Sequence, residues 1–173
     1  MKILYSKEEI SNRVKEIGKK ISEDFYGNDI VIAPILKGAV MFSSDLIREI
    51  TLPLRVDFLT VSSYHGTESS GQLKIKYLGD LDWSYKNVIL VEDIIDTGFT
   101  LSTVIDYLYK IKKPKTIKIC TLIDKYSRRK INVKADYVGF TLNEDHFVVG
   151  YGLDDGEYDR NLDSICIMGD IHD

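Results

Sequence analysis

Residues 87–101 constrain the fold of this chain more than any other stretch. The apolar run Val88–Val91 is followed at once by Glu92 and Asp93, and Asp96 comes three residues later. A short continuous apolar run is typical of a parallel strand that is buried on both faces of a sheet. Because open α/β sheets bind ligands at the carboxyl ends of their strands, we expect these three acids to line a site.

The turn after the acids, Thr97-Gly98-Phe99-Thr100, has the composition of a phosphate cradle. A small turn that opens a helix points backbone N–H groups and the positive end of the helix dipole outward. Carboxylates suit sugar hydroxyls or a metal ion, so the two features together indicate a site for a phosphorylated sugar. Each feature alone also fits a plainer structure, a solvated acidic loop or an ordinary turn with an N-cap. A Walker-type nucleotide hydrolase is excluded, because the sequence contains no G-x-x-x-x-G-K-[ST] motif.

The rest of the pattern predicts strands that alternate with helices. A capping box at Ser6–Glu9 opens an amphipathic helix that ends near Gly27-Asn28, and further helices are expected at residues 39–50 and 101–108. Strands are expected at residues 29–34, 55–63, 73–77, 88–91, 116–123, 137–140 and 147–149. This order predicts an α/β fold with a single domain, residues 1–173, in which helices flank a mostly parallel sheet and a small irregular hood ends the chain.

Composition limits the setting and the partners. The 173 residues suffice for one core without disulfides, and Cys120 and Cys166 lie in apolar contexts typical of buried structural thiols. The net charge of −4 argues against nucleic-acid binding, and we interpret Arg128, Arg129 and Lys130 as a solvated cluster. No apolar stretch has membrane-spanning length and the N-terminus lacks a signal-peptide core, so we expect a cytoplasmic protein that binds no membrane.

Residues 91–100 resemble the phosphoribosyl pyrophosphate signature of the type I phosphoribosyltransferases. Further motifs follow in the order of the hypoxanthine-guanine branch of that family, namely Leu36-Lys37-Gly38, Ser63-Tyr64, Lys125, and residues 136–140, 147–154 and 157–160. The resemblance implies a single phosphoribosyltransferase domain that acts in purine salvage. Such a domain transfers the 5-phosphoribosyl group from phosphoribosyl pyrophosphate to N9 of hypoxanthine or guanine, which gives IMP or GMP and pyrophosphate.

The resemblance also implies roles for the acids and for the turn. Glu92 and Asp93 would accept the ribose hydroxyls and support Mg²⁺, and Asp154 would help to hold a second Mg²⁺. Asp96 would act as general base at purine N7. Residues 96–100 would bind the 5′-phosphate through backbone N–H groups and threonine hydroxyls.

Other matching positions would bind the pyrophosphate. Lys37 and Gly38 would receive it at the end of an earlier strand, and Arg160 would reach it from the hood. The family has a cis peptide before this lysine, so a cis bond is expected here. Phe99 stands where some relatives place lysine, which removes one possible cationic contact with the phosphate.

The base would be bound by a third group of residues. Lys125 would donate to the O6 atom, which favours 6-oxopurines over adenine because the 6-amino group of adenine is itself a donor. Phe147 would stack on the purine ring and Val148 would offer backbone groups to its other edge. Ser63-Tyr64 and the polar loop at residues 65–71 would close over the site and exclude water.

Two alternatives to this function stay open. One is a xanthine-preferring relative, because specificity at position 2 of the base depends on backbone groups and water. The other is an RNA-binding regulator built on the same scaffold, which should carry a basic face. The family also suggests a homodimer or a homotetramer.

Overall fold

The computed structural model describes residues 1–63 and 73–169 of the chain. The helices are α1 (Lys7–Asp24), α2 (Val40–Glu49), α3 (Phe99–Ile111) and the short 3₁₀ helix η1 (Tyr126–Arg128). The strands are β1 (Lys2–Tyr5), β2 (Ile30–Leu36), β3 (Leu54–Val56), β4 (Leu59–Ser63), β5 (Leu73–Leu78), β6 (Asn87–Ile95), β7 (Thr116–Lys125), β8 (Tyr137–Leu142), β9 (Val148–Val149) and β10 (Ile165–Ile167). Tyr64, the predicted closing loop at residues 65–71 and the side chain of Ser63 lie outside the described part.

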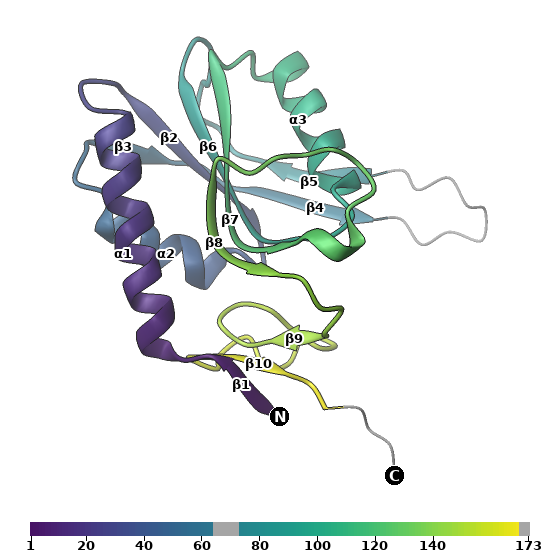
Figure 1. Ribbon diagram of the computed structural model, residues 1–173. Coiled ribbons are helices and arrows are strands. Elements are labelled where there is room, and N and C mark those ends of the chain that lie inside the picture. Colours follow the sequence, from purple (N-terminus) through teal and green to yellow (C-terminus); the bar gives the residue numbers. More distant parts are fainter. Residues whose placement is uncertain (64–72, 170–173) are drawn as a thin grey trace.

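The main sheet has the strand order β5-β4-β2-β6-β7-β8, and β3 also pairs with β2. Its strands run parallel except for the antiparallel pair β4 and β5. Helices α1 and α2 cover one face and α3 covers the other (Figure 1). The predicted α/β fold with a mostly parallel, helix-flanked sheet is therefore confirmed.

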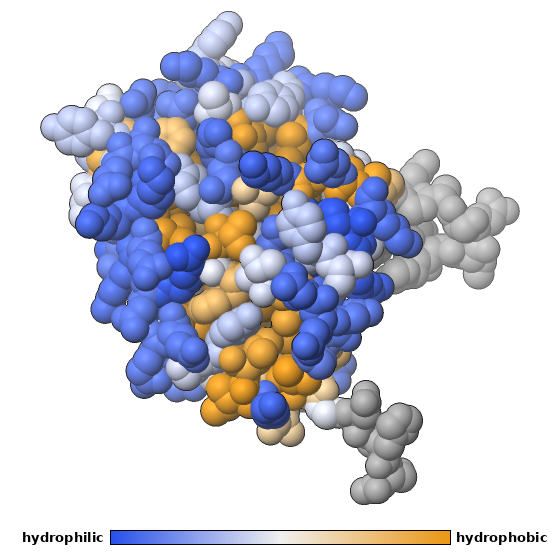
Figure 2. Space-filling view, in the orientation of Figure 1, coloured by the Kyte–Doolittle hydropathy of each residue, from blue (hydrophilic) through white to orange (hydrophobic). Residues whose placement is uncertain are grey.

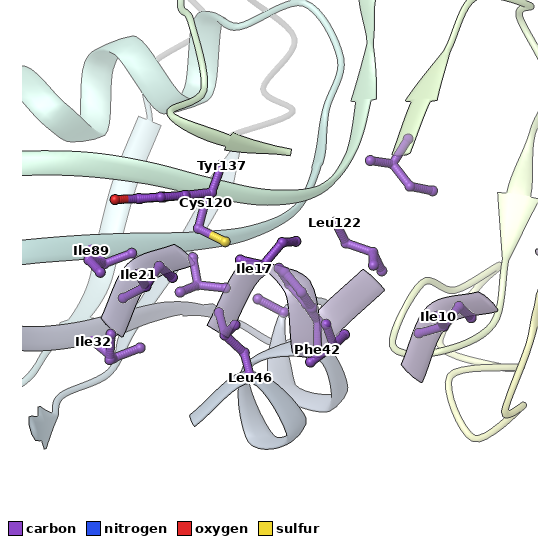
Figure 3. Close-up of a cluster of buried hydrophobic side chains, with 14 of the residues drawn as sticks. Ile10, Ile17, Ile21, Ile32, Phe42, Leu46, Ile89, Cys120, Leu122 and Tyr137 are labelled. Atoms are coloured by element: carbon purple, nitrogen blue, oxygen red, sulfur yellow. The ribbon is translucent and has the colours of Figure 1, made fainter. Parts of the chain in front are cut away.

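The apolar run of β6 is buried on both faces, as a central parallel strand requires. Ile89 and Val91 belong to the core beneath α1 and α2, and Val88 and Leu90 belong to the core beneath α3. Figure 3 shows the first of these cores, where side chains of α1 and α2 meet those of the sheet. Each fully buried side chain of this size contributes about 1.5–3 kcal/mol, so the run anchors the strand and fixes where its acidic end lies.

Local signals in the sequence set the start of α1. The Ser6 side chain accepts a bond from the Glu9 N–H at 3.3 Å, and the Glu9 carboxylate accepts from the Ser6 N–H at 2.8 Å. The predicted capping box is confirmed.

Cys120 and Cys166 are free and buried, which confirms the prediction of two structural thiols. None of the described helices is long and apolar enough to cross a bilayer.

Two strand predictions were wrong in their extent. The strand expected at residues 55–63 is split, because Asp57 turns inward and accepts a hydrogen bond from the buried Trp83 Nε1 at 2.8 Å. Strand β6 does not end at Val91 but continues to Ile95 along β7, in register with residues 120–124. Glu92 and Asp93 therefore lie within the strand rather than in a loop after it, and Asp96 follows its last residue.

The hood consists of β9, β10 and the connection at residues 150–164, and β1 completes it. The three strands form a small antiparallel sheet in the order β1-β10-β9, beside the carboxyl ends of the main strands (Figure 1). The sequence did not predict β1 or β10, because three or four residues are too few to show an alternating pattern. In Figure 2 hydrophobic residues gather over this part of the surface, where Ile3 is exposed.

Candidate active site

Two adjoining hollows lie at the carboxyl end of β6. The larger, of about 270 Å³, is lined by Ile35, Leu36, Gly38, Val61, Glu92, Asp93, Thr100, Asp154 and Arg160. The smaller, of about 210 Å³, is lined by Glu92, Ile94, Ile95, Asp96, Thr97, Gly98, Thr100 and Leu101. Glu92 and Thr100 line both hollows, so the two form one site. The structure thus brings together predicted residues from β2, β6, α3 and the hood.

The end of β2 lies directly against the acids of β6. A Cβ placed on Gly38 would lie only 1.6 Å from Asp93 Oδ2, so a side chain at this position would displace the carboxylate. The peptide bond between Leu36 and Lys37 is cis, as the family resemblance implied. Glycine at position 38 is therefore explained by close contact with an acid of the site.

The two neighbouring acids of β6 affect one another. Burial, and then the charge of Asp93, raise the pKa of Glu92 well above its ordinary value. A bound cation would favour the ionised form of both carboxylates. Among the described residues no group of three side chains is placed to hold a metal ion by itself. Hard oxygen donors in pairs still suit Mg²⁺, which commonly takes one or two carboxylates and completes its shell with substrate phosphates and water.

The turn before α3 has the geometry of an anion site. Gly98 is the N-cap, with φ of 82°, and α3 begins at Phe99. The first N–H groups of a helix have no backbone partner inside the helix, and here Gly98, Thr100 and Leu101 line the smaller hollow. The N–H of Phe99 donates to Thr97 Oγ1 at 3.4 Å. Gly98 is also confined by its neighbours, since a Cβ there would lie 2.8 Å from the Ile131 carbonyl oxygen. We call residues 95–98 the phosphate bend.

The interpretation of Arg129 as a solvated residue was wrong. Its side chain is only 9% exposed and forms an ion pair with the buried Asp124. Its Nε donates to the Asp96 carbonyl at 3.1 Å, and its guanidinium also bonds the carbonyls of Ile95 and Val133. Sequence reasoning missed this role because three consecutive basic residues carry no signal of which one turns inward.

Asp96, the predicted general base, is the second residue of the phosphate bend. Its Oδ1 atom is buried and accepts no hydrogen bond, although Arg128 Nε lies 3.5 Å away in an ion pair without hydrogen-bond geometry. Among the described residues, the only other buried side-chain atom without a partner is Arg160 Nε. Both atoms belong to predicted site residues. Buried polar atoms are nearly always paired, so the two atoms mark positions where polar groups of a ligand would fit.

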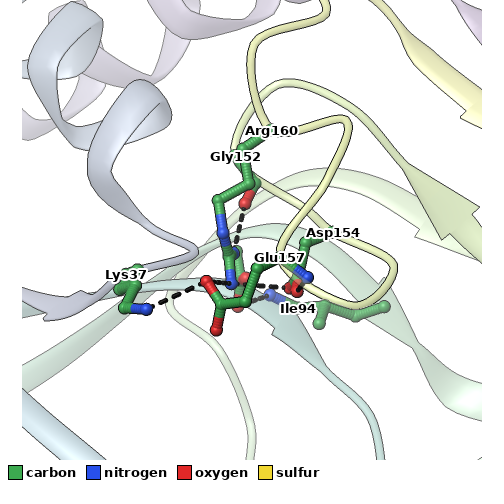
Figure 4. Close-up of polar contacts among 7 residues, drawn as sticks. Lys37, Ile94, Gly152, Asp154, Glu157 and Arg160 are labelled. Carbon is green, nitrogen blue, oxygen red and sulfur yellow. Dashed lines mark hydrogen bonds and ion pairs between the residues drawn. The ribbon is translucent and has the colours of Figure 1, made fainter.

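Lys37, Glu157 and Arg160 meet on the side of the site where the resemblance implied pyrophosphate binding (Figure 4). Lys37 Nζ donates to Glu157 Oε2 at 2.9 Å, and Arg160 contacts the same oxygen at 3.3 Å. Arg160 also pairs with Asp154 at 2.8 Å. The Lys37 bond is the main cause that lowers the pKa of Glu157. Sequence reasoning had not assigned a role to Glu157, whose carboxylate here lies between two cations expected to bind phosphate.

The base side of the site is formed by the end of β7 and the start of the hood. Lys125 is buried, donates to the His146 carbonyl at 3.0 Å and forms an ion pair with Asp145. That pair lowers the pKa of Asp145. Phe147 is 55% exposed, and Val148 is buried in β9.

Comparisons with known proteins agree with this geometry. The family model of the phosphoribosyl transferase domain matches residues 1–156. A hypoxanthine-guanine phosphoribosyltransferase of Aquifex aeolicus is 45% identical over 172 residues, which cover 98% of this chain and 96% of the relative. The enzyme of the same name from Bacillus subtilis is 46% identical over 170 residues, with coverage of 96% and 92%.

A solved structure shows the same likeness in three dimensions. The crystal structure of a hypoxanthine-guanine phosphoribosyltransferase from Bacillus anthracis is similar with a TM-score of 0.92 and 44% identity, over 98% of this chain and 99% of the other. The fold and the site therefore define a phosphoribosyltransferase domain. Within that class, the chain belongs to the hypoxanthine-guanine phosphoribosyltransferase family.

Proposed function

We propose that this protein transfers the 5-phosphoribosyl group of phosphoribosyl pyrophosphate to N9 of hypoxanthine or guanine, which gives IMP or GMP and releases pyrophosphate. The relatives named above carry this activity in their names. The observation that carries the proposal is the pair of unsatisfied buried atoms, Asp96 Oδ1 and Arg160 Nε, at the two sides of one hollow. Asp96 belongs to the phosphate bend and lines the smaller hollow, and Arg160 lines the larger one.

The phosphate bend supports the binding of the sugar phosphate. The N–H groups at the start of α3, with the hydroxyls of Thr97 and Thr100, are placed to hold the 5′-phosphate. The side chain of Phe99 is not needed for this, because its ring is half exposed and Phe99 lines neither hollow. The lysine found there in some relatives is therefore not required for the bend to bind an anion.

The acids of β6 suit the sugar at the transition state. Displacement at C1 by a purine nitrogen develops positive charge on the ribose and negative charge on the leaving group. Glu92 and Asp93 would put carboxylates beside the first, and Lys37 and Arg160 would put cations beside the second. Arg160 lines the larger hollow with the two acids, and Lys37 shares the Glu157 carboxylate with it. The opposite charges on the two sides of the hollow match the charge that develops in the reaction.

Mg²⁺ is the metal that the donor set fits. Glu92 and Asp93 would support the hydration shell of one ion, Asp154 would help to hold a second, and the phosphates of the substrate would supply further ligands. Bound there, Mg²⁺ would neutralise the charge of the leaving pyrophosphate. Asp154 already pairs with Arg160, so the acid and the cation lie on the same side of the hollow.

Base selection is proposed to depend on Lys125. Its ammonium lies at the end of β7 and donates to oxygen atoms of residues 145 and 146, so a purine O6 atom can replace one of them. Phe147 would stack on the ring and the backbone of Val148 would meet the opposite edge. Asp96 would accept the proton at N7, since Asp96 lines the smaller hollow.

A radiolabelled-base assay tests the function directly. With phosphoribosyl pyrophosphate and Mg²⁺, hypoxanthine and guanine should give IMP and GMP, and adenine should give no nucleotide. A clear preference for xanthine would replace the proposal by the xanthine-specific alternative. Failure of all four bases would contradict it, and RNA binding at low salt would then favour the regulator.

Chelation of Mg²⁺ with EDTA should abolish turnover, and added Mg²⁺ should restore it.

We also propose that residues 1–173 act as a single phosphoribosyltransferase domain in a homodimer or homotetramer. Val40 and Met41 at the start of α2, which follow Lys37 and Gly38 in the chain, are more than one-third exposed, and this favours a partner surface there. Light scattering on the purified protein should give a mass of two or four chains of 19.8 kDa. A monomer at all concentrations would contradict this part of the proposal.

A further inference from the structure

Arg129 lies between the phosphate bend and the end of β7. Its side chain is 9% exposed, and the Asp124 carboxylate with which it pairs is 7% exposed. Its guanidinium donates to the Asp96 carbonyl at 3.1 Å and to the Ile95 carbonyl at 3.4 Å. Asp124 directly precedes Lys125, which lies at the base side of the site. One buried side chain therefore links the two halves of the site.

Neighbouring backbone bonds fasten the same two segments together. The N–H groups of Lys130 and Ile131 both donate to the Thr97 carbonyl at 3.0 Å. Arg129 also bonds the Val133 carbonyl, which closes the loop around its guanidinium. Its Cδ atom lies 3.2 Å from the position that a Cβ on Gly98 would take. The phosphate bend cannot change shape without disturbing Arg129.

The chemistry of the position requires an arginine rather than any cation. Four acceptors surround the side chain, and only a planar guanidinium with five N–H donors can reach several of them at fixed angles. Burying an arginine–aspartate pair costs desolvation. Such a pair therefore often adds no more stability than well-packed apolar side chains of similar volume would. A geometric role explains its presence better than a gain in stability does.

We propose that Arg129 is a positioning residue, which holds the phosphate bend in its anion-binding shape and ties that shape, through Asp124, to Lys125. The proposal rests on the function proposed above for the bend. It assigns no contact between Arg129 and the substrate. Its effect reaches the 5′-phosphate through the carbonyls of Ile95 and Asp96, whose orientation sets the direction of the next N–H groups.

The test compares two ligands that use different sides of the site. Calorimetry would measure the binding of ribose 5-phosphate, which needs the bend, and of pyrophosphate with Mg²⁺, which needs Lys37 and Arg160. For Arg129→Gln we expect ribose 5-phosphate to bind about 10- to 100-fold more weakly, with pyrophosphate changed by about twofold at most. Equal weakening of both ligands, or of neither, would overturn the inference.

Two further variants separate geometry from charge and from general stability. Arg129→Lys keeps the charge beside Asp124 but loses the planar guanidinium, so ribose 5-phosphate should bind almost as weakly as to Arg129→Gln. Full recovery of the affinity for ribose 5-phosphate would overturn the inference. The matched control is Arg13→Gln, because Arg13 likewise donates to two carbonyls, of Val138 and Gly139, both at 2.8 Å. It should lower the melting temperature and leave ribose 5-phosphate affinity unchanged, and an equal loss of affinity in this control would count against the inference. If the wild type binds no ribose 5-phosphate, the proposed function fails instead.

Discussion

The two phosphate-binding sides of the site are built in different ways. The phosphate bend is fixed by buried bonds, since Arg129 and the backbone of residues 130–131 hold it from outside the hollow. The pyrophosphate side depends on exposed ion pairs, in which Lys37 and Arg160 share the carboxylate of Glu157. In the proposed function, the bend is ready for its ligand, whereas on the other side pyrophosphate would displace the Glu157 carboxylate from Lys37 and Arg160.

The largest effect is expected in the phosphate bend. Asp96→Ala should lower turnover by about 10²- to 10⁴-fold, because it removes a general base. The affinity for GMP should largely survive, since the N–H groups of the bend stay in place. Steady-state kinetics and calorimetry with GMP measure the two quantities. Unchanged turnover would remove Asp96 from the mechanism.

The base side is expected to respond more selectively. Lys125→Ala should raise the KM for hypoxanthine and guanine by about 10- to 100-fold, because a charged donor to O6 is lost. The KM for phosphoribosyl pyrophosphate should change much less. Lys134→Ala, at an exposed lysine, serves as the control and should leave both values unchanged. Equal increases in both KM values for Lys125→Ala would contradict the assignment.

Stiffness of the bend can be tested through Gly98. Gly98→Ala places a Cβ 2.8 Å from the Ile131 carbonyl at a residue with φ of 82°, so it should lower the free energy of unfolding by about 1–3 kcal/mol. Ribose 5-phosphate should also bind more weakly. Gly27→Ala is the matched control, because Gly27 has φ of 74° with no atom within 4 Å of the added Cβ. Urea unfolding should show the smaller loss for the control, and equal losses would mean that the bend is not confined.

The smallest effect is expected at Glu157. Glu157→Gln removes the carboxylate that competes with pyrophosphate for Lys37 and Arg160, so pyrophosphate should bind about two- to fivefold more tightly. The gain is small because the contact is exposed and screened by solvent. Glu16→Gln, which breaks an exposed pair with Arg13 on α1, is the control. Weaker binding of pyrophosphate to Glu157→Gln would show that Glu157 supports the ligand instead.

The sequence predicted the elements that carry strong local signals. The apolar run of β6, the capping box of α1 and the turn at Gly98 each specify their own structure through burial, hydrogen bonding or backbone freedom. These signals predicted which edge of the sheet carries the site, and the family resemblance then supplied the roles of the residues on that edge. The fold class and the position of the acids could therefore be predicted from residues close together in the chain.

The missed features all depend on contacts between distant segments. Arg129 is buried because Asp124 and the carbonyls of residues 95–96 meet it, and no local pattern distinguishes it from Arg128. Strand β1 forms only because β10 lies beside it, and its four residues have no pattern of their own. The bond between Asp57 and Trp83 split a predicted strand in the same way. The cytoplasmic location and the closing role of residues 65–71 stay predictions.

The most direct measurement is a crystal structure of the protein with phosphoribosyl pyrophosphate and Mg²⁺. We expect the 5′-phosphate oxygens about 2.7–3.2 Å from the N–H groups of residues 98–100, with the ribose hydroxyls on Glu92 and Asp93. The pyrophosphate should lie between Lys37 and Arg160, with Glu157 displaced. A sugar phosphate bound away from residues 92–100 would contradict the account.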